Sequence, residues 1–188
     1  MAPTVGVNIA IIQNGSILLT KREDFEIWCL PGGEVDAGES LAEAAMREAK
    51  EETGLDVRLL QLVGIYSLPD WQEGNHNVCF AAAAVGGELR LADGETIDVA
   101  YFPVDDLPDD LVPWHRQRIH DAVAGYGGSQ VSLQHIQSPY PTFMSRDEIY
   151  SRRDNSDWSR RDFFMQMMNR VPPVETHAEV PGRRLPGS

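Results

Sequence analysis

The 188-residue sequence predicts an α+β fold, because its apolar segments form hairpins of strands rather than a strict alternation of strands and helices. The turn Asn14-Gly15 joins two segments rich in β-branched residues, as in a tight hairpin. Residues 40–53 predict a helix, with Ser40 and Glu43 as a capping box and Gly54 as the C-terminal stop.

The remaining elements follow from the same patterns. Strands are expected at residues 5–12, 16–20, 57–67, 78–85 and 99–104. Pro113 predicts the start of a helix over residues 114–124. The short aromatic segment 25–30 ends at Pro31-Gly32-Gly33, which neither a helix nor a strand can pass through.

A Gly-rich break at residues 125–129 predicts where the core domain ends. We therefore expect a domain over residues 1–126 and a partly helical C-terminal extension over residues 127–171. The extension contains a strand-like segment, 131–136, and two helical segments near 145–153 and 158–171. Residues 172–188 are rich in Pro and Gly, which predicts an unstructured tail.

The charge of the chain is unevenly distributed. Residues 1–126 contain 8 Lys+Arg and 22 Asp+Glu, a net charge of −14, whereas the whole chain carries −13. Such a surface repels nucleic acid and anionic lipid, and neither partner is expected. No apolar segment approaches the length of a membrane span, and the first residues do not resemble a secretory signal. With only two cysteines, Cys29 and Cys79, far apart in the sequence, we expect a cytoplasmic protein with free thiols.

The helix at 40–53 contains an unfavourable cluster of acids. Glu48, Glu51 and Glu52 lie on one side, next to the predicted apolar face of Ala42, Ala45, Met46 and Ala49. Like charges three or four residues apart cost roughly 0.2–0.5 kcal/mol per pair, and the helix dipole disfavours anions in the last turn. A bound Mg²⁺ would resolve both conflicts, because it prefers oxygen ligands. The alternative is a solvated acidic face.

Residues 33–55 read Gly33, five residues, Glu39, seven residues, and then Arg47-Glu48-Ala49-Lys50-Glu51-Glu52-Thr53-Gly54-Leu55. This pattern resembles the Nudix box, G-x5-E-x7-R-E-U-x-E-E-x-G-U, where U is aliphatic. Ala49 is smaller than the usual residue there, and every other fixed position matches. The preceding segment 28–33, WCLPGG, is similar to the W-x-L-P-G-G sequence of the same family. By strand order the resemblance covers about residues 5–126, and it implies an α/β/α sandwich around a mixed β-sheet.

The resemblance also implies a function and a set of roles. Nudix enzymes hydrolyse nucleoside diphosphates linked to another group, using Mg²⁺ or Mn²⁺. Glu51 and Glu52 would be the main metal ligands, and Glu48 a further ligand or the general base. Arg47 would hold the glutamates in place as a bidentate guanidinium can, Glu39 would fix Arg47 or the loop, and the Gly33 carbonyl would reach the metal.

Candidates outside the box are fewer. Some Nudix enzymes take their base from a later loop, where Glu95 and Asp98 lie in this chain. Arg22, at the end of the first hairpin, is a candidate for phosphate binding, with a surface ion pair as the alternative. Tyr66 and Trp71 flank a proline whose offset from the box resembles ADP-ribose pyrophosphatases, and both are candidates for stacking on a substrate base, with core packing as the alternative for Tyr66.

Three functions remain open at this point. The first is hydrolysis of a nucleoside diphosphate derivative, such as ADP-ribose or a nucleotide sugar. The second is a MutT-type pyrophosphatase acting on nucleoside triphosphates, and the third is a nucleotide sensor without turnover, against which the intact glutamates argue. The aromatic residues of the extension are expected to pack on the core or on a second subunit, and we predict a homodimer.

Overall fold

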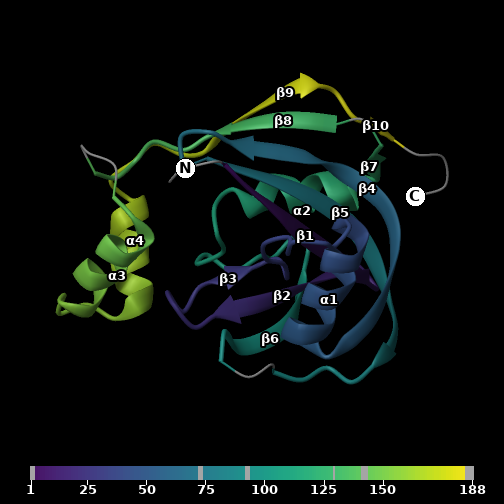
Figure 1. The fold of residues 1–188 in the computed structure, drawn as a ribbon, viewed down its shortest axis with the longest axis horizontal. Coiled ribbons are helices and arrows are strands. Elements are labelled where there is room, and N and C mark those ends of the chain that lie inside the picture. Colours follow the sequence, from purple (N-terminus) through teal and green to yellow (C-terminus); the bar gives the residue numbers. More distant parts are fainter. Residues whose placement is uncertain (1–2, 72–73, 92–93, 129, 141–143, 185–188) are drawn as a thin grey trace.

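The computed structural model describes residues 3–71, 74–91, 94–128, 130–140 and 144–184. Most of the chain forms one large mixed sheet, with the helical part of the extension at one end (Figure 1). No helix within the described ranges has the length and hydropathy of a membrane span. In chain order the elements are β1 (Thr4–Gln13), β2 (Ser16–Arg22), β3 (Trp28–Cys29), α1 (Leu41–Thr53), β4 (Leu55–Leu68), β5 (Asn75–Gly87), β6 (Thr96–Pro103), α2 (His115–Val123), β7 (Tyr126–Gly127), β8 (Gln130–His135), α3 (Arg146–Asp154), α4 (Arg160–Met168), β9 (Glu175–Val180) and β10 (Arg183–Arg184).

The strand order of the large sheet is β3-β2-β1-β5-β4-β8-β9, and β6 also pairs with β2. The β1–β2 hairpin turns at Asn14-Gly15, where both residues have positive φ, as the sequence predicts. β1 runs parallel to β5, whereas β4 and β5 are antiparallel over most of their length. The sheet is therefore mixed, which confirms the expected fold class.

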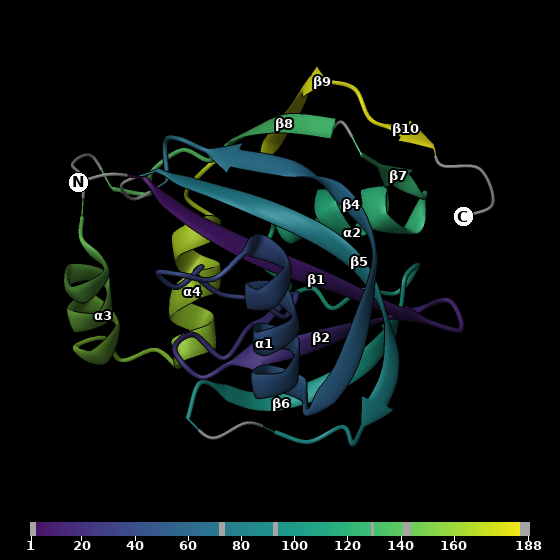
Figure 2. The same cartoon turned by 45° about the vertical axis from the view of Figure 1, so that its right-hand side comes forward.

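The helices α1 and α2 cover opposite faces of this sheet (Figure 2). Ala44, Ala45 and Ala49 of α1 are fully buried against side chains of β1, β2 and β4. The predicted apolar face is therefore wrong at Ala42 and Met46, which are both exposed. Ile119 and Ala122 of α2 pack in a second cluster on the other face. Two apolar layers with the sheet between them make the α/β/α sandwich, and they place the last turn of α1 beside β2 and the loop after β3.

The small residues of α1 explain why this helix lies so close to the sheet. Ser40 caps it with the expected reciprocal bonds to Glu43, and Gly54 ends it in a left-handed conformation. Because Ala49 is fully buried, its small side chain lets the backbone of α1 approach the strands. The acidic side chains of the next turn are therefore brought close to β2 and to the loop after β3.

The strand β8 is joined to the core by buried polar contacts. Arg118 of α2 is fully buried and donates to Gln134 of β8 at 2.9 Å and to Asn8 of β1. Asp121 accepts from Gln130 at 2.5 Å and from the Tyr66 hydroxyl at 2.7 Å. Residues beyond the Gly-rich break thus continue the same sheet.

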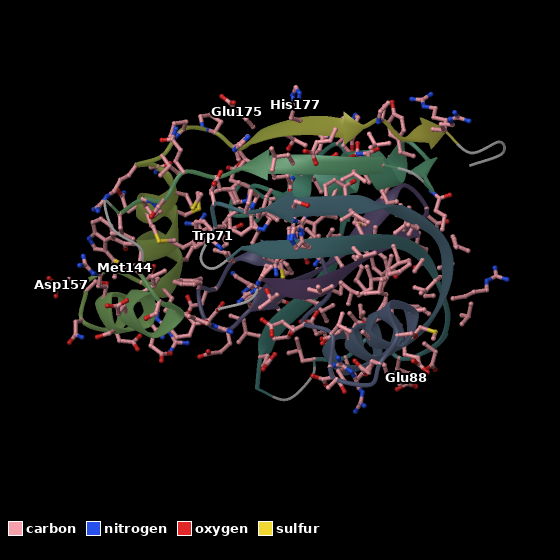
Figure 3. The ribbon with its side chains drawn as sticks, turned by 45° about the horizontal axis from the view of Figure 1, so that its top comes forward. Trp71, Glu88, Met144, Asp157, Glu175 and His177 are labelled. Atoms are coloured by element: carbon pink, nitrogen blue, oxygen red, sulfur yellow. The ribbon has the colours of Figure 1, made fainter. Side chains whose placement is uncertain are left out.

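The prediction of an unstructured tail over residues 172–188 is wrong for part of that segment. β9 pairs antiparallel with β8, and β10 pairs with β7. An edge strand needs only backbone partners, so a Pro- and Gly-rich composition did not reveal it. Residues 185–188 lie outside the described part of the chain. In Figure 3, Glu175 and His177 on β9 lie at the outer edge of the sheet.

The helices α3 and α4 pack against the loop between β2 and β3. The Phe25 ring lies 5.6 Å from that of Tyr150 on α3 and 5.4 Å from that of Phe164 on α4. Arg161 of α4 also forms an ion pair of 2.7 Å with Asp110. These aromatic residues pack within their own chain, which is one of the two expected outcomes. The homodimer stays a prediction.

Candidate active site

The loop that leads into α1 lies directly on strand β1. The Val7 amide donates to the Gly33 carbonyl at 2.9 Å, and the Ile9 amide donates to that of Pro31 at 2.9 Å. Gly32 has a φ of 146°, and a Cβ there would lie 2.0 Å from the Val7 carbonyl oxygen. Only glycine fits this position. The expected Pro-Gly-Gly turn therefore fixes the loop beside the acidic end of α1.

Glu52 points from α1 toward this loop. Its carboxylate accepts hydrogen bonds from the Gly32 amide at 3.0 Å and from the Thr20 hydroxyl at 3.4 Å. Burial raises the pKa of Glu52 to about 8; the Gly32 hydrogen bond and the charge of Arg22 oppose this rise, whereas Glu48 adds to it. A partly buried carboxylate that accepts only from neutral donors is poorly compensated for the loss of water.

Glu48 lies one turn earlier and faces Gly33. A Cβ on Gly33 would come within 2.5 Å of a Glu48 carboxylate oxygen, so the carboxylate lies against the loop backbone. Burial raises the pKa of Glu48, and the hydrogen bond from Arg47 opposes this rise. The Gly33 carbonyl, expected at the metal, is next to this carboxylate but already accepts the Val7 amide. One of its two lone pairs is therefore in use.

Arg47 connects the expected partners. Its Nε and Nη2 donate to the two Glu39 oxygens at 2.7 and 3.0 Å, the bidentate pair that the resemblance implies. Its Nη1 donates to Glu48 at 2.8 Å and to Glu51 at 3.0 Å, and Nη2 also reaches the Glu34 carbonyl at 3.2 Å. One guanidinium thus fixes two glutamates of the helix to the loop before it.

Glu51 is the most exposed of the three glutamates, with 58% of its side chain accessible. Among the residues that the structure describes, no three His, Cys, Asp or Glu side chains are already grouped to enclose a metal ion. Glu48 and Glu51 share Arg47, whereas Glu52 faces Gly32. The donor set nevertheless consists of carboxylate oxygens, which suit Mg²⁺ or Mn²⁺.

Glu95 precedes β6 on the far side of β2 and is exposed. Its carbonyl accepts a 2.8 Å hydrogen bond from the Glu23 amide. Burial is the main cause of the raised pKa of both Glu48 and Glu52, and the negative charge of Glu95 adds to it in each case. The charge of Glu95 therefore acts on two carboxylates of α1. The Asp98 carboxylate is engaged locally, because it accepts a 2.8 Å hydrogen bond from the Val99 amide.

The three predicted substrate contacts differ in position. Arg22 ends β2, near the glutamates, and its guanidinium forms a two-bond ion pair with Asp24 at 2.9 and 2.6 Å. Tyr66 is fully buried and donates to Asp121, so the prediction that it stacks on a substrate is wrong. Its position in β4 faces the α2 layer, and core packing, the stated alternative, is what the structure shows.

Trp71 lies away from the glutamates. Its ring is 5.0 Å from that of Trp114, in the apolar cluster beneath the extension. Figure 3 shows it between the sheet and the part of the extension where Met144 and Asp157 lie on either side of α3. The tertiary structure thus groups Trp71 with structural aromatic residues rather than with the carboxylates.

Two contacts near the site could not be predicted from the sequence. Thr20 of β2 contacts both Glu52 and, at 3.5 Å, the Cys29 thiol. His115 of α2 accepts a 3.0 Å hydrogen bond at Nδ1 from the Leu30 amide, at the start of the Pro-Gly-Gly loop. Both contacts depend on which strands pair and on how α2 packs, and no local signal in the sequence indicates them.

Comparison with known proteins agrees with this geometry. The NUDIX domain family profile matches residues 2–122. A Bacillus subtilis protein named "Putative 8-oxo-dGTP diphosphatase" is 40% identical over 127 residues, 67% of this chain and 83% of that protein. An ADP-ribose pyrophosphatase of Methanocaldococcus jannaschii is 38% identical over 56% of this chain and 65% of its own length.

Solved structures of Nudix hydrolases and ADP-ribose pyrophosphatases are also similar to this chain. An ADP-ribose pyrophosphatase from Streptococcus suis has a TM-score of 0.57 at 30% identity and covers 65% of this chain and 90% of its own. A MutT NUDIX hydrolase from Burkholderia pseudomallei has a TM-score of 0.57 at 32% identity, over 64% of this chain and 98% of its own. The family profile ends at residue 122, before β8, α3 and α4.

Proposed function

Because this chain belongs to the Nudix family of hydrolases, we propose that it uses Mg²⁺ or Mn²⁺ to hydrolyse the diphosphate linkage of a nucleoside diphosphate derivative. ADP-ribose or a nucleotide sugar is the first choice of substrate. The observation that carries this proposal is the Glu52 carboxylate, which is partly buried beside Glu48 and bonded only to neutral donors. A divalent cation would supply the missing positive charge.

Each residue of the box has a task in this mechanism. Glu48, Glu51 and Glu52 would hold the metal, which when bound would withdraw charge from the phosphoryl oxygens and lower the pKa of water. For this, the exposed Glu51 carboxylate has to exchange its hydrogen bond with Arg47 for the cation. Arg47 keeps Glu48 oriented while Glu39 fixes Arg47.

A carboxylate then accepts the proton of the attacking water. Glu48 is one candidate and Glu95 the other, a choice supported by the effect of the Glu95 charge on the pKa of Glu48 and Glu52. The water oxygen attacks one phosphorus atom, the bond from this phosphorus to the bridging oxygen breaks, and the second phosphate leaves. Arg22 is proposed to contact a phosphate of the substrate.

A second candidate is a MutT-type pyrophosphatase that acts on nucleoside triphosphates. The Bacillus subtilis relative, which shares 40% identity and carries the name of an 8-oxo-dGTP diphosphatase, favours it. The ADP-ribose pyrophosphatases of Methanocaldococcus jannaschii and Streptococcus suis favour the first. A sensor without turnover is the weakest alternative, because Arg47, Glu48, Glu51 and Glu52 are all present.

One assay distinguishes the three functions. The protein is incubated with Mg²⁺ and, separately, with ADP-ribose, nucleotide sugars, dinucleoside polyphosphates and nucleoside triphosphates, and the products are identified. AMP and ribose 5-phosphate from ADP-ribose support the first function. A monophosphate and pyrophosphate support the second. Tight binding without any product would contradict both and leave the sensor.

A further inference from the structure

Arg22 and the metal-binding carboxylates share one face of β2. Side chains two residues apart in a strand point the same way, with a separation of about 7 Å. Thr20 contacts Glu52, so Arg22 points to the same side. The β2–β6 pairing is irregular between Lys21 and Arg22, but the unpaired extra residue, Ile97, belongs to β6. Successive side chains of β2 therefore still point to opposite faces of the sheet. The Arg22 side chain is therefore the next one along this face of β2 after Thr20, the residue that contacts Glu52.

Asp24 links this guanidinium to the extension. Its carboxylate is only 13% exposed and accepts two hydrogen bonds from Arg22. It also accepts a 2.7 Å hydrogen bond from the Tyr150 hydroxyl of α3, and the Arg146 guanidinium lies 3.9 Å away. The buried Asp24 carboxylate thus lies next to an arginine of the core and an arginine of the extension.

The face of α3 that meets Asp24 is defined by helical spacing. Arg146, Tyr150 and Arg153 follow at intervals of four and three residues, so they lie on the same side. Arg146 donates to the Tyr150 hydroxyl at 2.7 Å, which orients its guanidinium. Arg152 lies on another side, where its guanidinium covers Tyr140.

Two accessible guanidiniums remain around a single acid. The side chain of Arg22 is 44% exposed and that of Arg146 is 63% exposed. With one negative charge from Asp24, the group carries a net positive charge within an otherwise acidic domain. Arginine N–H groups that are already oriented bind phosphate oxygens well.

We propose that Arg22 and Arg146 form a phosphate subsite, in which α3 completes the substrate-binding site of the Nudix domain. The ligand is the phosphate group of the substrate next to the one that is attacked. This rests on the proposed function, since a diphosphate linkage supplies both groups. Asp24 and Tyr150 are positioning residues that keep the guanidiniums of Arg22 and Arg146 close to each other.

Binding without turnover gives the first test. Inorganic pyrophosphate is titrated into the metal-free protein by calorimetry, with Arg22→Ala, Arg146→Ala and, as a matched control on α3, Arg152→Ala. We expect Kd to rise about 10-fold in the first two variants, the usual scale for a charged hydrogen bond. Kd should stay within about twofold in the control. Absent binding in the wild type, or an equal effect in Arg146→Ala and Arg152→Ala, would overturn the subsite.

Turnover gives the second test, with whichever nucleotide proves to be the substrate. Arg146→Ala should raise KM about 10-fold with little change in kcat, and Arg146→Lys should recover part of the loss. Tyr150→Phe should raise KM less, because it removes only the orienting hydroxyl. A fall in kcat at constant KM would contradict the proposal. If no nucleotide is hydrolysed, the proposed function fails, and the pyrophosphate titration still decides the subsite.

Discussion

The backbone amide of Gly32 donates a 3.0 Å hydrogen bond to the carboxylate of Glu52. This bond joins the loop after β3 to the last turn of α1, so the two halves of the Nudix motif meet at one carboxyl group. No Lys or Arg within the described ranges forms an ion pair with Glu52. The last turn of the helix therefore presents an acid that is positioned by neutral donors.

Glu52→Gln should separate stability from activity. Burial raises the pKa of Glu52 to about 8, so at pH 7 the metal-free folded protein keeps a proton on Glu52 that the unfolded chain has released, and this costs stability. Glutamine can still accept the Gly32 hydrogen bond. We expect Tm without metal to rise by about 2–4 °C, the equivalent of about 1 kcal/mol, while kcat falls at least about 100-fold. Calorimetry and product analysis measure the two effects.

The metal response provides the control for that variant. Mg²⁺ or Mn²⁺ should raise the Tm of the wild type, because a ligand that binds the folded state stabilises it. The same addition should leave the Tm of Glu52→Gln nearly unchanged. Near-normal turnover in this variant would contradict the assigned role of Glu52.

Arg47→Lys should impair catalysis although the charge is kept. Lysine cannot form the two parallel bonds to Glu39 while also holding Glu48 and Glu51. We expect kcat to fall about 10- to 100-fold, as for residues that orient metal ligands. Lys50→Ala is the matched control on the same helix, because its ion pair with Asp56 is exposed and worth little. Equal kcat in the two variants would refute the positioning role.

Gly33→Ala should displace Glu48. The added Cβ would lie 2.5 Å from a Glu48 oxygen, so the carboxylate has to move. We expect a loss of kcat of about 10-fold or more with a small change in Tm, because the displaced group is the end of a flexible side chain. Gly86→Ala is the control, since its Cβ would come no closer than 3.3 Å to Asp56. An active Gly33→Ala enzyme would show that the position of Glu48 is not critical.

His115 should make the stability of the protein depend on pH. Burial lowers the pKa of His115 well below its usual 6.5, and its Nδ1 accepts the Leu30 amide, so the folded protein holds a neutral imidazole. Below about pH 6.5 the unfolded chain binds a proton that the folded chain does not. Stability is therefore complete above this pH and falls below it, at up to about 1.4 kcal/mol per pH unit.

Urea unfolding between pH 7 and 5 measures this dependence. His115→Asn keeps a hydrogen-bond acceptor for the Leu30 amide but cannot be protonated in this range. We expect the free energy of unfolding to fall more steeply with decreasing pH in the wild type than in the variant. Parallel curves for the two proteins would mean that His115 does not titrate as expected.

The helix and the hairpins could be predicted from the sequence because their signals are local. The capping box of Ser40 and Glu43, the Asn14-Gly15 turn and the spacing of Arg47, Glu48, Glu51 and Glu52 lie within short segments. A helix converts such spacing directly into a shared face. The sequence alone therefore could predict the carboxylates, the arginine that orients them and the family.

Only the tertiary structure decided which of the other candidates lie at the site. Tyr66 is buried against α2, whereas Arg22 meets Asp24 and, through it, Tyr150. The Asp24–Tyr150 contact joins residues 126 positions apart, and no periodicity along the chain encodes such a distance. Docking of the extension depends on the complementary shape and charge of two surfaces that exist only after each has folded.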